Sequence, residues 1–413
     1  MEKARKPNKK ITNFALEPNE KTLEQFKNCY SEKYVVKASL MPDAHVGYVA
    51  PIGAVLATKD YLVPAWVGYD IGCGMTAVKL PKNIMNSLRE KANAIYESVK
   101  RRIPMGLGEI HNSDSQVTIE TLKEYKKILA DFKKGQYDKK VLQFLESEKA
   151  VRTLGTLGHG NHFISLNSDD SGTPWIVVHS GSRAIGHRVA TLYMKKSSGK
   201  EEGFEATHPL HSGSQEGKEY LNLLKFGLEF AKLNRLEMAK QVCITLEKII
   251  GKKIKFMIWT NKNHNHALLE SGLFVHRKGA TPAKKGEKGI IPANMRDGSF
   301  LVEGKGNKDF ISSSSHGAGR VMSRKQAKET LDTSYFRKEM EDAGVIGNFT
   351  DASIDEAPEV YKDIYKVLDA QKKSIKILNH LKPFINWQGE GFRGSWKNSG
   401  QTGLRVEGRN RKR

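Results

Sequence analysis

The sequence predicts an α+β protein with a single domain, in which central β-sheets are flanked by helices. Residues 34–80, 151–187 and 255–322 alternate short apolar runs with Gly, Pro, Asp or Asn, which is typical of strands joined by tight turns. The stretches between them carry apolar residues at helical spacing. No linker rich in Pro, Gly or Ser divides the chain, so the polar residues suited to chemistry are expected to form one composite site.

In chain order, the first expectation is a basic, flexible N-terminus over residues 1–20, followed by one domain over 21–389. Within 63–67, alternating apolar residues predict a strand. Apolar spacing predicts helices at 84–104, at 219–250 and at 358–382. Residues 118–148 are expected to form two charged helices in a surface insertion, and the polar composition of 195–217 predicts a loop. Residues 390–413 have the composition of a basic, flexible tail.

Charge and cysteine content limit the class of function. The formal net charge of +22 favours a polyanionic partner, of which nucleic acid is the leading choice. The sequence contains no run of 18 or more apolar residues, so we expect no membrane span. The polar N-terminus lacks the apolar stretch of a secretory signal. Three cysteines provide no disulfide framework and indicate a reducing compartment, so we expect a cytoplasmic protein.

Candidate metal ligands occur in glycine-rich contexts. The stretch "VPAWVGYDIGCGM" presents Asp70 and Cys73 together, one a hard ligand and the other a soft one. Four histidines follow apolar runs and lie among Gly, Ser or Asn: His162, His179, His264 and His316. Each histidine alone is more simply explained as a hydrogen-bonded core or loop residue, but four such contexts together favour a functional cluster.

A cysteine, an aspartate and three histidines are too many ligands for one closed tetrahedral zinc site. A thiolate that bridges two divalent ions would use the whole set. Two ions about 4 Å apart are the usual arrangement for holding a phosphoryl group, which agrees with the basic charge. These ligand types by themselves would also accept zinc or cobalt.

Pieces suited to binding anions surround these residues. Arg183 lies in "HSGSRAIGH", Lys278 in "HRKGAT" and Arg320 in "HGAGR". Arginine beside glycine-rich backbone is a common phosphate-binding combination. One such motif would be weak support, but three in one chain point to a phosphate-containing substrate.

The motifs together resemble those of the RtcB family of RNA ligases. "MPDAHVGY", "VGYDIGCGM", "LGTLGHGNHF", "VVHSGSRAIGH", "HRKGAT", "GKGN", "SSHGAGR" and "DEAPEVYKDI" occur in the order seen in that family. The resemblance spans roughly residues 36–389. The segment 118–148 and the tail after residue 389 lie outside the common pattern.

The resemblance implies a single RtcB-like domain with a dinuclear metal site. It implies an enzyme that uses GTP and two Mn²⁺ ions to join an RNA 2′,3′-cyclic phosphate or 3′-phosphate to a 5′-hydroxyl, in RNA splicing or repair. His316 falls on the histidine that carries covalent GMP. The implied metal ligands are Asp70, Cys73, His162, His179 and His264, with Cys73 bridging. The implied phosphate contacts include Asn161 and Asn265, and Phe163 and Tyr361 fall where the family packs the guanine ring.

Two departures from the family pattern concern the base of the nucleotide. Ser165 stands where the family usually has a glutamate that contacts guanine, and Gln388 stands where it usually has a lysine. Neither change touches a metal ligand or the nucleophile. We therefore expect ligase chemistry, with a selectivity for guanine that is relaxed towards ATP or another nucleotide.

Three functions remain as alternatives at this point. Besides the ligase, the chain is consistent with a metal-dependent RNA cyclic phosphodiesterase or phosphatase, and with an RNA-binding protein that has no activity. The intact "SSHGAGR" favours the ligase, because a hydrolase has no use for a histidine that accepts a nucleotide. The expected partners are RNA with such ends and an archease-like activator; we expect a monomer and no association with membranes.

Overall fold

The computed structural model describes residues 9–389, and the predicted α+β class is confirmed. Its larger sheet has seven strands in the order β13-β14-β16-β6-β7-β5-β9, and all neighbouring pairs are antiparallel. The strands are β5 Gly74–Lys79, β6 Phe163–Asp169, β7 Pro174–Ser180, β9 Met257–Asn263, β13 Lys288–Pro292, β14 Ser299–Gly304 and β16 Ile375–Gln388.

The second sheet has five strands in the order β1-β2-β3-β11-β10, in which only the pair of β1 and β2 is parallel. Two further pairs are formed by β12 with β15 and by β4 with β8. The bounds are β1 Lys10–Asn13, β2 Val35–His45, β3 Ile52–Thr58, β4 Tyr61–Leu62, β8 Leu210–His211, β10 Asn265–Glu270, β11 Leu273–Lys278, β12 Ala280–Pro282 and β15 Ser313–Ser315.

The two large sheets meet where the chain passes from β9 to β10. His264 is the one residue between these strands. Its backbone N–H donates to the carbonyl of Cys73 at 2.7 Å, which ties the junction to the start of β5. The junction therefore brings residues from both sheets to one place.

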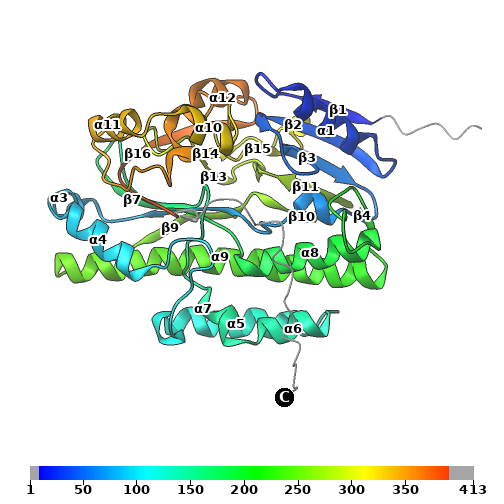
Figure 1. Ribbon diagram of the computed structural model, residues 1–413, viewed down its shortest axis with the longest axis horizontal. Helices are drawn as coiled ribbons and strands as arrows, with labels where there is room; N and C mark the ends of the chain where they lie inside the picture. The colour runs from blue at the N-terminus through cyan, green and yellow to red at the C-terminus, as the bar shows by residue number, and fades with distance from the viewer. Residues whose placement is uncertain (1–8, 390–413) are drawn as a thin grey trace, which may run out of the picture.

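Helices cover the sheets on two sides (Figure 1). The longest, α9, runs along one side, and α5, α6 and α7 lie beyond it; α10, α11 and α12 lie on the other side. The helices are α1 Glu20–Ser31, α2 Pro64–Val67, α3 Met85–Glu90, α4 Ala92–Arg102, α5 Ile119–Phe132, α6 Lys139–Leu145, α7 Glu148–Arg152, α8 Ala184–Ser198, α9 Gln215–Ile250, α10 Arg324–Thr330, α11 Thr333–Asp342 and α12 Ile364–Ala370. None of the helices in residues 9–389 is both long and apolar enough to span a bilayer.

The 36-residue helix α9 is stabilised at both ends and along one face. The Ser214 side chain accepts a hydrogen bond from the Gly217 N–H, and Gly251 ends the helix in the left-handed conformation with a φ of 74°. Its apolar residues, such as Leu224 and Leu246, are buried. At 1.5 Å per residue the helix is about 54 Å long, so it reaches under much of both sheets.

Two predictions of secondary structure are wrong. The strand expected at 63–67 is the short helix α2, because Pro64 supplies a first helical position and Gly68, with a φ of 73°, ends the turn. The helix expected at 358–382 is only α12, and β16 follows it. Strand β16 is held by pairing with β14 and β6, partners distant in sequence that override local apolar spacing.

Other predicted element boundaries also differ from those in the structure. Residues 10–13, in the N-terminal segment expected to be flexible, form β1 and pair with β2, so the expectation does not hold for them. Residues 195–198, expected in a loop, complete α8. The helices expected at 84–104 and 219–250 are present as α3 with α4 and as α9, and α5 and α6 form within 118–148. The expectations for residues 1–8 and for the tail 390–413 lie outside the described residues.

Candidate active site

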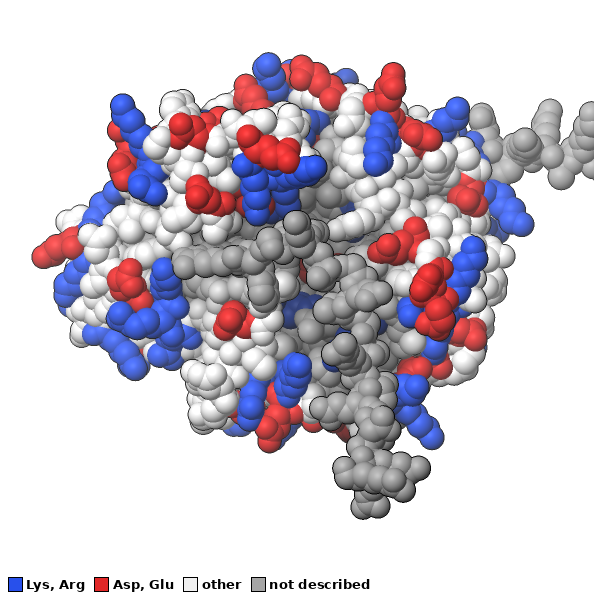
Figure 2. Space-filling model, viewed as in Figure 1, with Lys and Arg blue, Asp and Glu red and all other residues white. Residues whose placement is uncertain are grey.

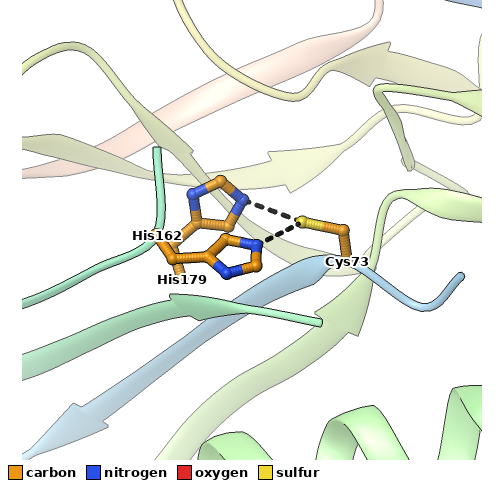
Figure 3. Close-up of side chains that lie close together, drawn as sticks. All are labelled: Cys73, His162 and His179. Atoms are coloured by element: carbon orange, nitrogen blue, oxygen red, sulfur yellow. Dashed lines mark hydrogen bonds between the residues drawn. The ribbon is translucent and has the colours of Figure 1, made fainter. Parts of the chain in front are cut away.

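Three predicted ligands form the centre of the site (Figure 3). Cys73 precedes β5, His162 precedes β6 and His179 lies on β7, which are neighbouring strands of the larger sheet. The Cys73 Sγ lies 3.5 Å from His162 Nε2 and 3.2 Å from His179 Nε2, and all three residues are buried. One ligand atom from each lies within 4.8 Å of the others, which is close enough for one metal ion to bind all three.

The other two predicted ligands extend this group in two directions. His264 Nε2 lies 3.3 Å from His179 Nε2, and Asp70 Oδ2 lies 3.0 Å from His162 Nε2. The structure therefore brings all five predicted ligands together. A thiol, three imidazoles and a carboxylate fit one or two divalent transition-metal ions.

Backbone carbonyls orient two of the imidazoles. His162 Nδ1 donates to the carbonyl of Leu157 at 3.1 Å, and His179 Nδ1 donates to that of Asn161 at 2.9 Å. A proton held on Nδ1 leaves the lone pair on Nε2, which is the nitrogen that faces Cys73. The rings are thus arranged to bind a cation through Nε2.

Burial sets the charges of the site. Burial lowers the pKa of His179 and of His264 well below the ordinary value, so both rings are neutral at physiological pH. Burial raises the pKa of Cys73 well above its ordinary value, and the charge of Asp70 acts in the same direction. A cation that binds this thiol releases its proton, so occupancy is expected to rise with pH.

A buried arginine of α9 supports the ligands from beneath. The Arg235 guanidinium donates to the carbonyls of Gly72 at 3.0 Å and Ser180 at 2.8 Å, and to Asn263 Oδ1 at 2.7 Å. Each of these residues directly adjoins one predicted ligand in the sequence. Arg235 is completely buried, so water does not compete for these bonds.

The preceding residue, Asn234, holds the loop that leads to His162. Its Oδ1 accepts from the N–H of Gly155 at 2.8 Å, and its Nδ2 donates to the carbonyls of Thr156 at 3.2 Å and Gly181 at 3.1 Å. Asn234 is also completely buried. Two adjacent side chains of one helix thus fix the segments that carry Cys73, His162, His179 and His264.

We expect Arg235→Met to weaken the affinity for Co²⁺ or Mn²⁺ roughly 10- to 100-fold, because the segments that carry the ligands lose their shared anchor. The binding constant would be measured by titration of the thiolate-to-cobalt absorption band, with far-ultraviolet circular dichroism to confirm folding. Lys225→Met, an exposed position on the same helix, is the matched control and should bind Co²⁺ like the wild type. If Arg235→Met does not fold, Arg235→Lys keeps the charge but not the fork of donors. An unchanged cobalt affinity in a folded variant would contradict this role.

His316 lies against the cluster and comes from the two-stranded sheet of β12 and β15. It follows β15, and its ring centroid is 4.9 Å from that of His264. Its Nδ1 donates to Asp43 Oδ2 at 2.7 Å, and the same oxygen accepts from the N–H groups of His316 at 3.1 Å and Gly317 at 3.2 Å. Because Nδ1 is held by a carboxylate, the lone pair of His316 is on Nε2.

Asp43 was not identified from the sequence as a functional residue. It lies on β2 and is completely buried, and its only signal was its place in "MPDAHVGY". Burial by itself would raise its pKa, but His316 and the hydrogen bond from that ring hold the pKa below the ordinary value. His45, in the same stretch, has a pKa that burial lowers to about 4, so its ring is neutral.

A cavity of about 900 Å³ opens beside the cluster and His316. Besides His316, Asp70 and His179, it is lined by seven of the nine residues predicted to contact nucleotide or phosphate: Asn161, Phe163, Ser165, Lys278, Arg320, Tyr361 and Gln388. Its size and its mixture of aromatic, cationic and amide side chains suit a nucleotide.

Two cationic residues of the cavity, Lys278 and Arg320, are held by protein contacts. The ammonium of Lys278 donates to the carbonyl of Val67 at 2.8 Å, and desolvation lowers its pKa to about 8 against the opposing effect of Asp70 and Cys73. Arg320 lies 5.5 Å above the ring centroid of Tyr361 and donates to the Asp355 carbonyl at 2.7 Å. These contacts reduce the rotamer freedom that the two cations lose on binding a phosphate.

Two of the lining residues, Ser165 and Gln388, carry neutral polar groups. Ser165 Oγ accepts from Asn167 Nδ2 at 2.9 Å, and Gln388 Nε2 donates to the Gly160 carbonyl at 2.5 Å.

Arg324 is a further lining residue that was not identified from the sequence. It lines the cavity and pairs with Asp355 at 2.6 Å. Its only sequence signal is its position four residues after Arg320.

Two predicted phosphate contacts do not line the cavity. Asn265 is buried, and its Nδ2 donates to the carbonyls of Val67 at 3.0 Å and Asp70 at 2.6 Å, so it anchors the segment that carries Asp70. Arg183 Nε donates to Thr156 Oγ1 at 3.2 Å. In this structure both residues support the loops around the cluster.

The fold and site define an α+β protein with a candidate transition-metal centre beside a nucleotide-sized cavity. A family model described as "tRNA-splicing ligase RtcB" matches residues 25–389. An RNA-splicing ligase RtcB1 of Escherichia coli (strain ATCC 25922) is 33% identical over 373 residues, which cover 84% of this chain and 88% of the relative. A tRNA-splicing ligase RtcB of Nanoarchaeum equitans is 28% identical over an alignment of 421 residues, which covers 84% of this chain and 87% of the relative. The chain belongs to the RtcB family.

Proposed function

We propose that this protein is an RNA ligase that joins RNA 2′,3′-cyclic phosphate or 3′-phosphate ends to 5′-hydroxyl ends, in RNA splicing or repair. The observation that carries the proposal is the place of His316. One histidine, with Nδ1 bound to Asp43, lies at a nucleotide-sized cavity and in contact with the ligand cluster. Membership of the family agrees with this reading.

The reaction we propose has three transfers. His316 Nε2 attacks the α-phosphorus of GTP, so a nitrogen–phosphorus bond forms and pyrophosphate leaves. An oxygen of the RNA 3′-phosphate then attacks the same phosphorus, which breaks that bond and leaves the RNA end joined to GMP. Finally the 5′-hydroxyl attacks the RNA 3′-phosphorus, gives up its proton and displaces GMP. A cyclic phosphate is first opened by water.

The residues of the site have distinct parts in these steps. Asp43 holds the proton of His316 on Nδ1 and stabilises the positive charge that the ring gains when Nε2 bonds to phosphorus. Lys278 and Arg320 offset the negative charge of the phosphoryl oxygens. Asp70, Cys73, His162, His179 and His264 are the residues proposed to hold two Mn²⁺ ions, which when bound supply Lewis acidity at the phosphates.

The choice of base is a separate part of the proposal. Ser165 and Gln388 present neutral groups where the family pattern has a glutamate and a lysine, so the cavity has lost two charges that select guanine. We propose that GTP is a substrate and that ATP competes with it more effectively than in relatives with both charges. Three further properties are also proposals: an archease-like activator as a partner, a monomeric state and a cytoplasmic location.

The alternative is a metal-dependent RNA cyclic phosphodiesterase or phosphatase that does not ligate. Hydrolysis needs the metal ligands and a water molecule but no group that accepts a nucleotide. The pairing of His316 with a buried carboxylate favours the ligase, because it prepares a nucleophile that a hydrolase does not require.

The test is the intact mass of the protein after incubation with Mn²⁺ and, separately, GTP, ATP, CTP or UTP. We expect a gain of one nucleoside monophosphate with GTP and a substantial fraction of that adduct with ATP. His316→Ala should show no adduct. His211→Ala, at an exposed histidine that does not line the cavity, should behave as the wild type. No adduct with any nucleotide would favour the phosphoesterase, and an adduct with GTP alone would contradict the relaxed base selectivity.

A further inference from the structure

The rim of the cavity carries an exposed aromatic residue that the reaction leaves unused. Tyr48 lies in the turn between β2 and β3 and lines the cavity, and the residue is 81% exposed. Among residues 9–389 it is the most exposed large hydrophobic side chain. An aromatic ring left in water at the mouth of a binding cavity is a candidate contact for a ligand.

The backbone beneath Tyr48 is held by hydrogen bonds, although the residue itself is largely exposed. Gln25 of α1 donates from Nε2 to the carbonyls of Gly47 at 2.8 Å and Tyr48 at 3.2 Å, and its Oε1 accepts from the Gly47 N–H at 3.1 Å. The turn is tight as well, since a Cβ on Gly47 would lie 2.1 Å from the carbonyl oxygen of Ala50. The ring is thus presented on a fixed support, which reduces the entropy lost when a ligand stacks on it.

Two more rings form a row with Tyr48, and neither of them lines the cavity. The centroid of Tyr69 lies 6.1 Å from that of Tyr48 in an edge-to-face arrangement, and Tyr69 stacks on His187 at 4.7 Å with 17° between the planes. The hydroxyl of Tyr69 donates to Glu205, which fixes that ring. Tyr69 directly precedes Asp70, so this row of rings adjoins the proposed metal site.

We propose that the exposed ring of Tyr48, which Tyr69 and His187 support, is an aromatic platform on which an unpaired base of the RNA strand stacks, next to the end that reacts. The proposal rests on the proposed function, and it names a feature of the substrate: a single-stranded nucleotide beside the junction. Aromatic faces accept any base, and they complement a chain of net charge +22 that attracts the phosphates. A blunt, fully paired end offers no base to this platform.

The experiment compares RNA binding by the wild type with that by Tyr48→Ala, Tyr48→Phe and Tyr335→Ala. Tyr335 is a matched control, 60% exposed on α11 and absent from the lining of the cavity. Non-reacting RNAs carry 2-aminopurine at the terminal nucleotide of either a 5′-hydroxyl or a 3′-phosphate overhang. Affinity is read by anisotropy and stacking by fluorescence quenching, with a blunt duplex as the unstacked reference.

We expect the wild type to quench 2-aminopurine and to bind overhangs more tightly than blunt ends. Tyr48→Ala should lose the quenching and bind overhangs roughly 5- to 100-fold more weakly, whereas Tyr48→Phe and Tyr335→Ala should retain both. Equal quenching and affinity in Tyr48→Ala and the wild type would overturn the platform. A wild type that forms the nucleotide adduct and binds RNA without preference for overhangs would also overturn it and leave the ligase intact. Failure of the wild type to bind any RNA would count against the proposed function itself.

Discussion

Replacing Cys73 by serine is expected to abolish tight binding of Mn²⁺ or Co²⁺, and with it formation of the proposed nucleotide adduct. Its sulfur is the atom shared by the contacts to His162 and His179, and a hydroxyl in its place does not give up its proton as a thiol does. We expect a loss of affinity larger than the roughly 10- to 100-fold that follows removal of a supporting residue. The measurement is a Co²⁺ titration, in which the thiolate-to-cobalt band should disappear.

The matched control is Cys243→Ser, which changes a buried thiol in the core formed by α9 and its neighbours. That variant should lose stability and keep the cobalt band. If both serine variants kept the band, Cys73 would not be a ligand. If both lost it, the effect would come from general destabilisation.

Replacing Asp43 by asparagine is expected to slow formation of the proposed adduct on His316 by about 10²- to 10⁴-fold, by analogy with carboxylates that orient catalytic histidines. An amide oxygen still accepts the hydrogen bond from Nδ1, but it carries no charge to stabilise the ring as Nε2 bonds to phosphorus. The rate would be followed by intact mass under single-turnover conditions.

Cobalt affinity separates this effect from damage to the metal site. Asp43→Asn should bind Co²⁺ with an affinity close to that of the wild type, because Asp43 contacts His316 and makes no contact with Cys73, His162 or His179 in the described structure. Asp369→Asn, at an exposed carboxylate, is the control for the loss of one negative charge. A wild-type rate in Asp43→Asn would contradict the role given to the carboxylate.

Charge on this protein is widely distributed, which limits what net charge predicts. Figure 2 shows Lys and Arg side chains over much of one face, with Asp and Glu side chains between them. Many of these groups pair with one another at the surface, as Lys127 does with Glu124 and Lys372 with Asp369. The net charge of +22 therefore indicates a polyanionic partner but does not by itself locate the surface that binds it.

The sequence by itself determined the α+β class, and its local pattern together with the family resemblance singled out the five residues predicted to bind metal. Cys73, His162, His179 and His264 were recognisable because each lies beside Gly, Ser or Asn next to an apolar run, and Asp70 was recognisable because it lies three residues before Cys73. The structure brings all five together at the junction of two sheets. Local pattern was sufficient to find the cysteine and the three histidines because each lies at or next to the end of a strand.

Only the tertiary structure decided which residues support that cluster. Asp43, Asn234 and Arg235 lie inside a strand and a helix, where a polar residue gives no local sign of its partners. Their roles come from hydrogen bonds to groups more than 50 residues away in sequence. The same cause explains β16, which local apolar spacing assigned to a helix and which pairing with β14 and β6 makes a strand. Local chemistry fixes what a side chain can do, and long-range packing fixes what it meets.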